Sequence, residues 1–222
     1  MKNKSKIIGI VALVVLACTL MAVVETIIEP TYAVKSAIKV VLFFALPILV
    51  LKSFKQKPFE SFAAIKKKQV LFLLCLGLIV YAVIMGAYFV ARGFFDFSAL
   101  VSSLSSDQNV SPNSFIYVAA YISFGNSLLE EFMFRLVSFL VLSKFVPKWA
   151  AYLFSSLSFA LYHIAMIGAS FPLPLVILSV VGLAVGGALF CLVDDRNKNI
   201  YNSWIIHMFA DFAIMTIWFI HI

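Results

Sequence analysis

Apolar stretches of about twenty residues recur along almost the whole chain, and they limit what it can fold into more than any other feature. A stretch of that length crosses a bilayer as one helix, because a helix rises about 1.5 Å per residue and the hydrocarbon core is about 30 Å thick. Hydrophobic residues make up 64% of the 222 and charged residues only 12%, which leaves no room for a soluble domain. We therefore expect an all-α, polytopic transmembrane bundle that forms one membrane-embedded domain over residues 1–222.

The expected helices number about seven by length and hydropathy, and basic residues predict their orientation. We place the spans at 7–28, 34–53, 70–94, 115–142, 149–167, 172–193 and 202–221. Lysine and arginine gather before the first span and after the second, fourth and sixth, and cytoplasmic loops carry such an excess. We therefore expect a cytoplasmic N-terminus and an external C-terminus.

The net charge of +7 follows from these topology signals, so we expect no nucleic-acid partner. The lysines of 52–68 face the anionic cytoplasmic leaflet, and the lipid bilayer is the expected partner. Segment 54–69 alternates lysines with apolar residues, which predicts an amphipathic stretch on the cytoplasmic surface; a loop with snorkelling lysines is the alternative. In the sixth span, the spacing of Gly182, Gly186 and Gly187 predicts a helix-packing seam.

Acidic residues within the expected spans need an explanation, and Glu130, Glu131 and Asp211 lie there. An ionised side chain at the bilayer centre costs roughly 2.5 to 3.5 kcal/mol on insertion scales, so such residues usually pair, line a cavity or do chemistry. Residues four apart share a helix face, so Glu131 is expected to meet Arg135 while Glu130 is left over. Glu25, near the end of the first span, is expected only to snorkel.

The same spacing of four recurs in "FALYH", with Phe159 and His163, and in "HMFAD", with His207 and Asp211. Two of the three histidines therefore lie in the spans that flank the sixth, and the third, His221, is expected to fray into solvent. A lone intramembrane histidine or aspartate is more often a packing residue, and "EExxxR" alone could be a structural ion pair. Their joint appearance favours a catalytic site.

A carboxylate with two imidazoles can activate water in two ways, and both stay open. Glu130 can act as general base beside the histidines, taking a proton from water and returning it to a leaving amine. Alternatively, Glu130, His163 and His207 can hold a catalytic Zn²⁺ with an open fourth position. A proton or ion carrier that uses the same residues is less favoured, because no pair of broken helices marks a transport site.

These motifs resemble those of the CPBP family of intramembrane endopeptidases, also called the Abi or CAAX-protease and bacteriocin-processing family, which includes the Rce1-like prenyl-protein endopeptidases. "EEFMFR" matches the EExxxR motif, "FALYH" matches FxxxH, and "HMFAD" matches Hxxx(N/D). The three motifs span about residues 124–212, in order and on separate expected helices, within a motif-bearing core of about 115–221.

The resemblance implies an all-helical membrane enzyme that hydrolyses peptide bonds in a cavity open to the cytoplasm and the bilayer. By position, Glu130 and His163 would activate the water, while His207 and Asp211 would stabilise the oxyanion or position the substrate. Eukaryotic members tend to carry asparagine at the last position, whose amide can donate to an oxyanion, whereas Asp211 donates only when protonated. Asp211 would otherwise orient His207 or serve as an additional ligand.

The remaining motif residues have supporting roles by the same resemblance. Glu131 and Arg135 would hold the site together, and Phe159 would pack beside His163. Family members are often described as metalloproteases, although a metal-free glutamate mechanism is also proposed, so Zn²⁺ stays an open alternative.

Substrate and location follow only from general features. The short lysine-rich N-terminus and compact length are typical of a bacterial multi-pass protein of the cell (plasma) membrane. Expected substrates are pheromone or bacteriocin precursor peptides, or a segment of a membrane protein. The family also includes bacteriocin-immunity proteins and non-catalytic scaffolds that bind a membrane partner protein, which is the alternative function.

Overall fold

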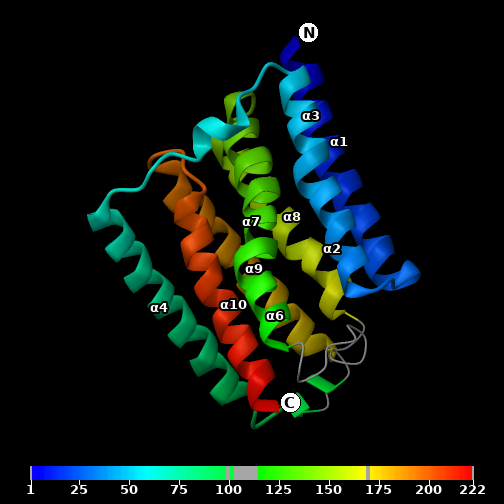
Figure 1. The fold of residues 1–222 in the computed structure, drawn as a ribbon, viewed down its shortest axis with the longest axis vertical. Coiled ribbons are helices and arrows are strands. Elements are labelled where there is room, and N and C mark those ends of the chain that lie inside the picture. Colours follow the sequence, from blue (N-terminus) through cyan, green and yellow to red (C-terminus); the bar gives the residue numbers. More distant parts are fainter. Residues whose placement is uncertain (1, 99–100, 103–114, 169–170, 222) are drawn as a thin grey trace. The chain divides into compact units, whose positions relative to one another are not determined.

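The computed structural model describes residues 2–98, 101–102, 115–168 and 171–221, and helices dominate the described part, which contains no strand (Figure 1). The elements are α1 (Lys2–Val23), η1 (Val24–Ile28), α2 (Tyr32–Val40), η2 (Val41–Ala45), α3 (Leu46–Ser53), η3 (Pro58–Ser61), α4 (Lys67–Ala91), α6 (Phe115–Ala120), η4 (Tyr121–Asn126), α7 (Ser127–Glu130), η5 (Glu131–Val141), η6 (Leu142–Lys144), α8 (Lys148–Ile167), α9 (Leu173–Asp195) and α10 (Tyr201–His221).

Six helical stretches of the described residues are long and apolar enough to cross a membrane, which confirms the expected polytopic all-α class. The expected fourth span, 115–142, is not among the six, although 115–144 is one continuous helical run. It differs from the other stretches by carrying Glu130, Glu131 and Arg135 within its length. The motif charges therefore lie in the least lipid-like of the expected spans.

The helical run 115–144 is not uniformly α-helical, because η4 and η5 are wound as π-helix. A π-helix closes its backbone hydrogen bonds one residue further along the chain than an α-helix, is rare, and often occurs at functional sites. The wider winding of η5 starts at Glu131, and all eleven of its residues are buried. The motif carboxylates thus lie at a change in helical winding.

The chain divides into two compact units, residues 1–63 with 129–203 and residues 64–128 with 204–222. In the first unit, which we call unit 1, α8 packs against α9 and η5, and α1 packs against both α8 and η5. The second, unit 2, contains α4, α6, η4 and most of α10. The expectation of one domain over the whole chain stays a prediction.

The expected glycine seam of α9 is confirmed at one position and wrong at two. A Cβ built on Gly187 would lie 3.1 Å from Ser156 Cα, so α8 and α9 approach closely there. No described atom lies within 4 Å of a Cβ built on Gly182 or Gly186. The close approach therefore uses a single glycine, because the other two face away from the α8 contact.

Within unit 2, α4 and α10 pack tightly against each other. A Cβ on Gly77 would lie 2.4 Å from a ring carbon of Phe209, so only glycine fits that position without a shift. The expectation that His221 frays into solvent is wrong, since its Nε2 lies 2.8 Å from Tyr88 Oη and its Nδ1 lies 3.0 Å from Ser98 Oγ. Two hydrogen bonds thus hold the last turn of α10.

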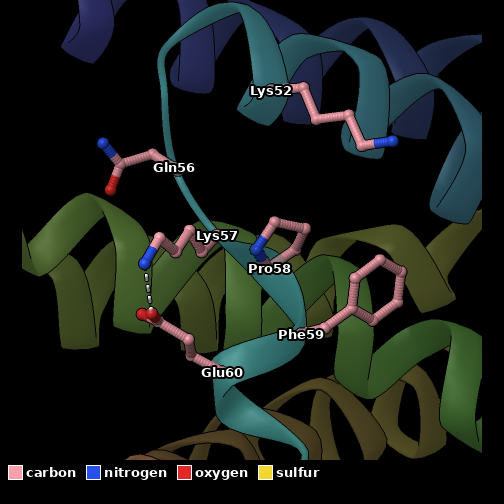
Figure 2. A pocket seen from close by; sticks show the side chains of 6 residues that line it. All are labelled: Lys52, Gln56, Lys57, Pro58, Phe59 and Glu60. Atoms are coloured by element: carbon pink, nitrogen blue, oxygen red, sulfur yellow. Dashed lines mark ion pairs between the residues drawn. The ribbon is translucent and has the colours of Figure 1, made fainter.

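Within the expected amphipathic stretch 54–69, residues 54–66 form a loop that contains only the short turn η3, and α4 begins at Lys67. The part of the loop in unit 1 is held at two residues: Ser61 O accepts a hydrogen bond from Ile200 N at 3.1 Å, and Phe62 packs against Phe132 and Tyr201. A pocket of about 460 Å³ lies beside this loop. Figure 2 shows the side chains that line it. Its lining residues are Lys52, Gln56, Lys57, Pro58, Phe59 and Glu60, none of which belongs to a motif.

Candidate active site

Glu130 is the last residue of α7, at the junction with η5, and only 1% of its surface is exposed. No proline interrupts the helix between Pro112 and Pro147, so the run can carry this residue deep into unit 1. Glu130 Oε1 accepts a hydrogen bond from Lys39 Nζ at 2.6 Å. Glu130 Oε2 lies 3.7 Å from His163 Nε2. The carboxylate therefore faces a lysine with one oxygen and a histidine with the other.

The expectation that Glu130 is left over without a counter-ion is wrong, because Lys39 of α2 pairs with it. Lys39 is 5% exposed, and its Nζ lies 5.3 Å from the ring centroid of Phe43 and 5.0 Å from that of Tyr162. Two aromatic faces and a carboxylate are favourable surroundings for a buried cation. Sequence reasoning missed Lys39, although a lysine within the span 34–53 needs a partner as much as a glutamate does.

His163 lies on α8 and its ring is held by its own helix. Its Nδ1 lies 2.8 Å from the carbonyl oxygen of Phe159, one turn earlier. Because a carbonyl oxygen only accepts hydrogen bonds, we assign the ring proton to Nδ1, which leaves a lone pair on Nε2 when the ring is neutral. The Phe159 ring packs against the imidazole at a centroid distance of 4.7 Å. His163 thus presents an acceptor nitrogen toward Glu130.

The separation of 3.7 Å between Glu130 Oε2 and His163 Nε2 is too long for a direct hydrogen bond. Two acceptors at this distance suit one water molecule. A water oxygen about 2.8 Å from both atoms would see them at an angle of about 83°, close enough to the water angle for both O–H bonds to be donated. Such a water is polarised by a carboxylate and an imidazole together, and its oxygen becomes a better nucleophile.

Glu131 and Arg135 form a second charged pair, with Arg135 Nε 3.1 Å from Glu131 Oε2 and both side chains fully buried. The Arg135 guanidinium carbon lies 4.3 Å from the ring centroid of Phe159 and 5.0 Å from that of Phe190. The pair thereby joins η5 to α8 and α9. Because Phe159 contacts both Arg135 and His163, this ion pair also supports the face of α8 that carries the histidine.

His207 and Asp211 lie on α10 within unit 2, with His207 Nε2 3.7 Å from Asp211 Oδ1. The His207 side chain is buried, and 16% of the Asp211 side chain is exposed. At this separation the two interact electrostatically, without a direct hydrogen bond between these atoms. The structure thus brings the predicted residues together as three pairs, each within its own unit: Glu130 with His163, Glu131 with Arg135, and His207 with Asp211.

A further buried pair corrects the expectation that Glu25 only snorkels. Glu25 of η1 lies 3.0 Å from Lys35 Nζ of α2, and the two side chains are 11% and 6% exposed. Lys35 and Lys39 are one helical turn apart, and each contacts a different carboxylate. The α2 helix therefore carries two buried lysines, each paired with a carboxylate from another element.

Zn²⁺ binding by Glu130, His163 and His207 stays a prediction, because Glu130 and His163 belong to unit 1 and His207 belongs to unit 2. Over the described ranges, no three His, Cys, Asp or Glu side chains are grouped closely enough to hold a metal ion. Glu130 also bonds the Lys39 ammonium, whose positive charge would repel a divalent cation at the same carboxylate.

A comparison with known families agrees with the motifs. Residues 112–213 match the family model described as type II CAAX prenyl endopeptidase Rce1-like. The resemblance is thereby confirmed. All three motifs lie within the matched residues, whereas Lys39 lies outside them. No curated protein and no solved structure matches the chain. Because the Rce1-like family is a protease family, the match supports protease activity at the level of the family.

Proposed function

We propose that the protein is an intramembrane endopeptidase that hydrolyses a peptide bond of a membrane-associated peptide or protein. The observation that carries the proposal is the pair of acceptors Glu130 Oε2 and His163 Nε2, which lie 3.7 Å apart inside the Rce1-like region, with side chains that are 2% and 16% exposed. A structural ion pair needs only opposite charges. In the neutral tautomer that we assign to His163, with its proton on Nδ1 toward Phe159 O, Nε2 is an acceptor that faces the carboxylate. That arrangement suits a bound water rather than a packing contact.

The proposed reaction uses Glu130 as general base and then as general acid. Glu130 takes a proton from the water as its oxygen attacks the peptide carbonyl carbon, which forms the new C–O bond and an oxyanion. Collapse of the oxyanion breaks the C–N bond, and Glu130 returns the proton to the departing nitrogen. The products are a carboxyl group and an amine. His163 holds the water through its Nε2 lone pair and fixes the direction of attack.

His207 and Asp211 enter the proposal through the Hxxx(N/D) motif rather than through geometry. We assign them stabilisation of the oxyanion or positioning of the substrate, and the electrostatic contact of Asp211 with the His207 ring supports an orienting role for Asp211. The general sequence features described above favour pheromone or bacteriocin precursors, or a membrane-protein segment, as substrates. The same features favour the plasma membrane of a bacterium as the location.

The test compares peptide termini in membranes of cells that express the native protein, Glu130→Gln or His163→Ala at equal, folded levels. Glu60→Gln is the matched control, because it makes the same change at an exposed carboxylate outside the motifs. We expect new termini with the native protein and the control, and none with the two site variants. Identical termini with native protein and Glu130→Gln would contradict hydrolysis, and partner binding that survives both variants would favour the scaffold or immunity role.

A further inference from the structure

Lys39 forms the shortest contact described for the carboxylate of Glu130, although it lies outside every motif and outside the matched region. Both side chains are almost fully buried, at 6% and 2% exposure. In such surroundings an ammonium and a carboxylate each stabilise the charged form of the other, and neither would stay charged alone. A general base must be a carboxylate rather than a carboxylic acid before it can take a proton.

We propose that Lys39 is a positioning residue of the hydrolytic site, which keeps Glu130 ionised and turns its Oε2 toward His163. The inference rests on the proposed function and deepens it, because it adds a residue from the N-terminal half to the machinery. Lys39 acts through Glu130 and needs no contact with the substrate.

Orientation follows from the shape of the carboxylate. The two oxygens move together when the carboxylate group rotates. The hydrogen bond from Lys39 Nζ to Oε1, at 2.6 Å, therefore also restricts the position of Oε2. Oε2 is the atom that lies 3.7 Å from His163 Nε2, the distance that suits a shared water. Loss of the lysine contact would let the carboxylate rotate away from the imidazole, and small misplacements of a base are costly in rate.

Lys39 is itself held by aromatic rings that belong to the same framework as His163. Its Nζ lies over the rings of Phe43 and Tyr162, whose centroids are 5.2 Å apart. Tyr162 precedes His163 on α8, and these two rings also pack together. The lysine and the histidine are thus fixed against one cluster, on opposite oxygens of Glu130.

Other titratable groups near Glu130 do not replace this cation. His163 and Tyr162 approach from α8, and Cys18 of α1 interacts electrostatically with both Lys39 and Glu130. None of these carries a fixed positive charge. The second lysine of α2, Lys35, contacts Glu25 instead, and it therefore offers a matched control.

The test measures kcat and KM in detergent for a synthetic quenched peptide that spans the cleavage site found by the comparison of termini. The variants are Lys39→Met, Lys39→Gln, Lys39→Arg, Lys35→Met and Glu130→Gln. We expect the neutral Lys39 variants to lose about 100-fold or more in kcat with a KM within about threefold, as for loss of an interaction that matters in the transition state. Lys39→Arg keeps the cation and should recover to within about tenfold of the native kcat.

Lys35→Met is a control for structural disruption, because it removes the counter-ion of Glu25 just as the Lys39 variants remove that of Glu130. It should leave kcat near the native value. Lys39→Gln stays informative if Lys39→Met does not fold, because the amide keeps a hydrogen-bond donor without the charge. The role of Lys39 would be overturned if its neutral variants kept the native kcat, or if Lys35→Met lost as much kcat as they do. In either case an inactive Glu130→Gln would leave the proposed function standing. An active Glu130→Gln would overturn both.

Discussion

The fully buried pair of Glu131 and Arg135 gives the sharpest prediction about stability. At the observed 3.1 Å, two unit charges attract by about 5 kcal/mol when the effective dielectric constant is about 20. Desolvation of both groups offsets much of this gain, so the intact pair stabilises little. Removing one partner is different, because the group left behind is buried without its counter-ion and either stays charged or changes its protonation, each at a cost in free energy. We expect Arg135→Met to lower the free energy of unfolding by about 3 to 5 kcal/mol.

The measurement is denaturant unfolding in detergent micelles for a double-mutant cycle of Arg135→Met, Glu131→Leu and the combined variant. The combined variant removes both charges of the pair. It should recover most of the loss, to within about 2 kcal/mol of native, with the remainder due to lost stacking of the guanidinium on Phe159. Lys57→Met is the matched control, because the Lys57–Glu60 pair has a similar distance of 3.2 Å but is largely exposed. Lys57→Met should hardly change the free energy of unfolding.

Two outcomes would refute this reasoning. If Arg135→Met unfolds within about 1 kcal/mol of native, Glu131 is not an ionised, buried partner, contrary to the expected cost of stranding a charge. If the two single effects simply add in the combined variant, the side chains do not interact despite their distance. Either result would also remove the support that we assign to this pair beneath Phe159 and His163.

Two further predictions concern packing and capping, and the same unfolding assay checks both. Gly77→Val should cost about 1 to 3 kcal/mol through overpacking against Phe209, whereas Gly86→Ala, which has open space, should be neutral or slightly stabilising; equal effects would contradict the contact. Asp194→Ala should lower the free energy of unfolding by about 1 to 3 kcal/mol. The buried Asp194 carboxylate accepts hydrogen bonds from Ser203 N at 2.9 Å and from Ser203 Oγ at 2.7 Å, and both donors would lose their acceptor. An unchanged midpoint would mean that water replaces the carboxylate.

Local rules predicted the helices and the pairs that lie within one helix. Glu131 with Arg135 and His207 with Asp211 are four residues apart, and helical spacing alone brings such side chains together. The hydropathy of the spans fixed the all-α class for a similar reason, since every backbone polar group in a bilayer must be paired within its own helix. These features depend on neighbours in the chain and survive any arrangement of the helices.

Contacts between helices could not be predicted in the same way. Lys39 and Glu130 are 91 residues apart, and no periodicity shows which helices pack or how each is rotated. The glycine spacing in α9 failed for this reason, because Gly187 meets α8 while Gly182 and Gly186 do not. The cost of a buried charge was nevertheless a usable signal, since a lysine within an apolar span is expected to have an acidic partner.

The position of Lys39 bears on what the N-terminal helices do. The family match begins at residue 112, so α1, α2 and α3 contribute nothing to it and could serve only as membrane anchors. An anchor has no reason to bury a cation, because an apolar side chain at position 39 would need no counter-ion. Retaining the lysine is explained if Glu130 has to be a carboxylate. The N-terminal helices then supply part of the hydrolytic site, and a fragment limited to 112–213 would hold all three motifs while lacking the counter-ion of its base.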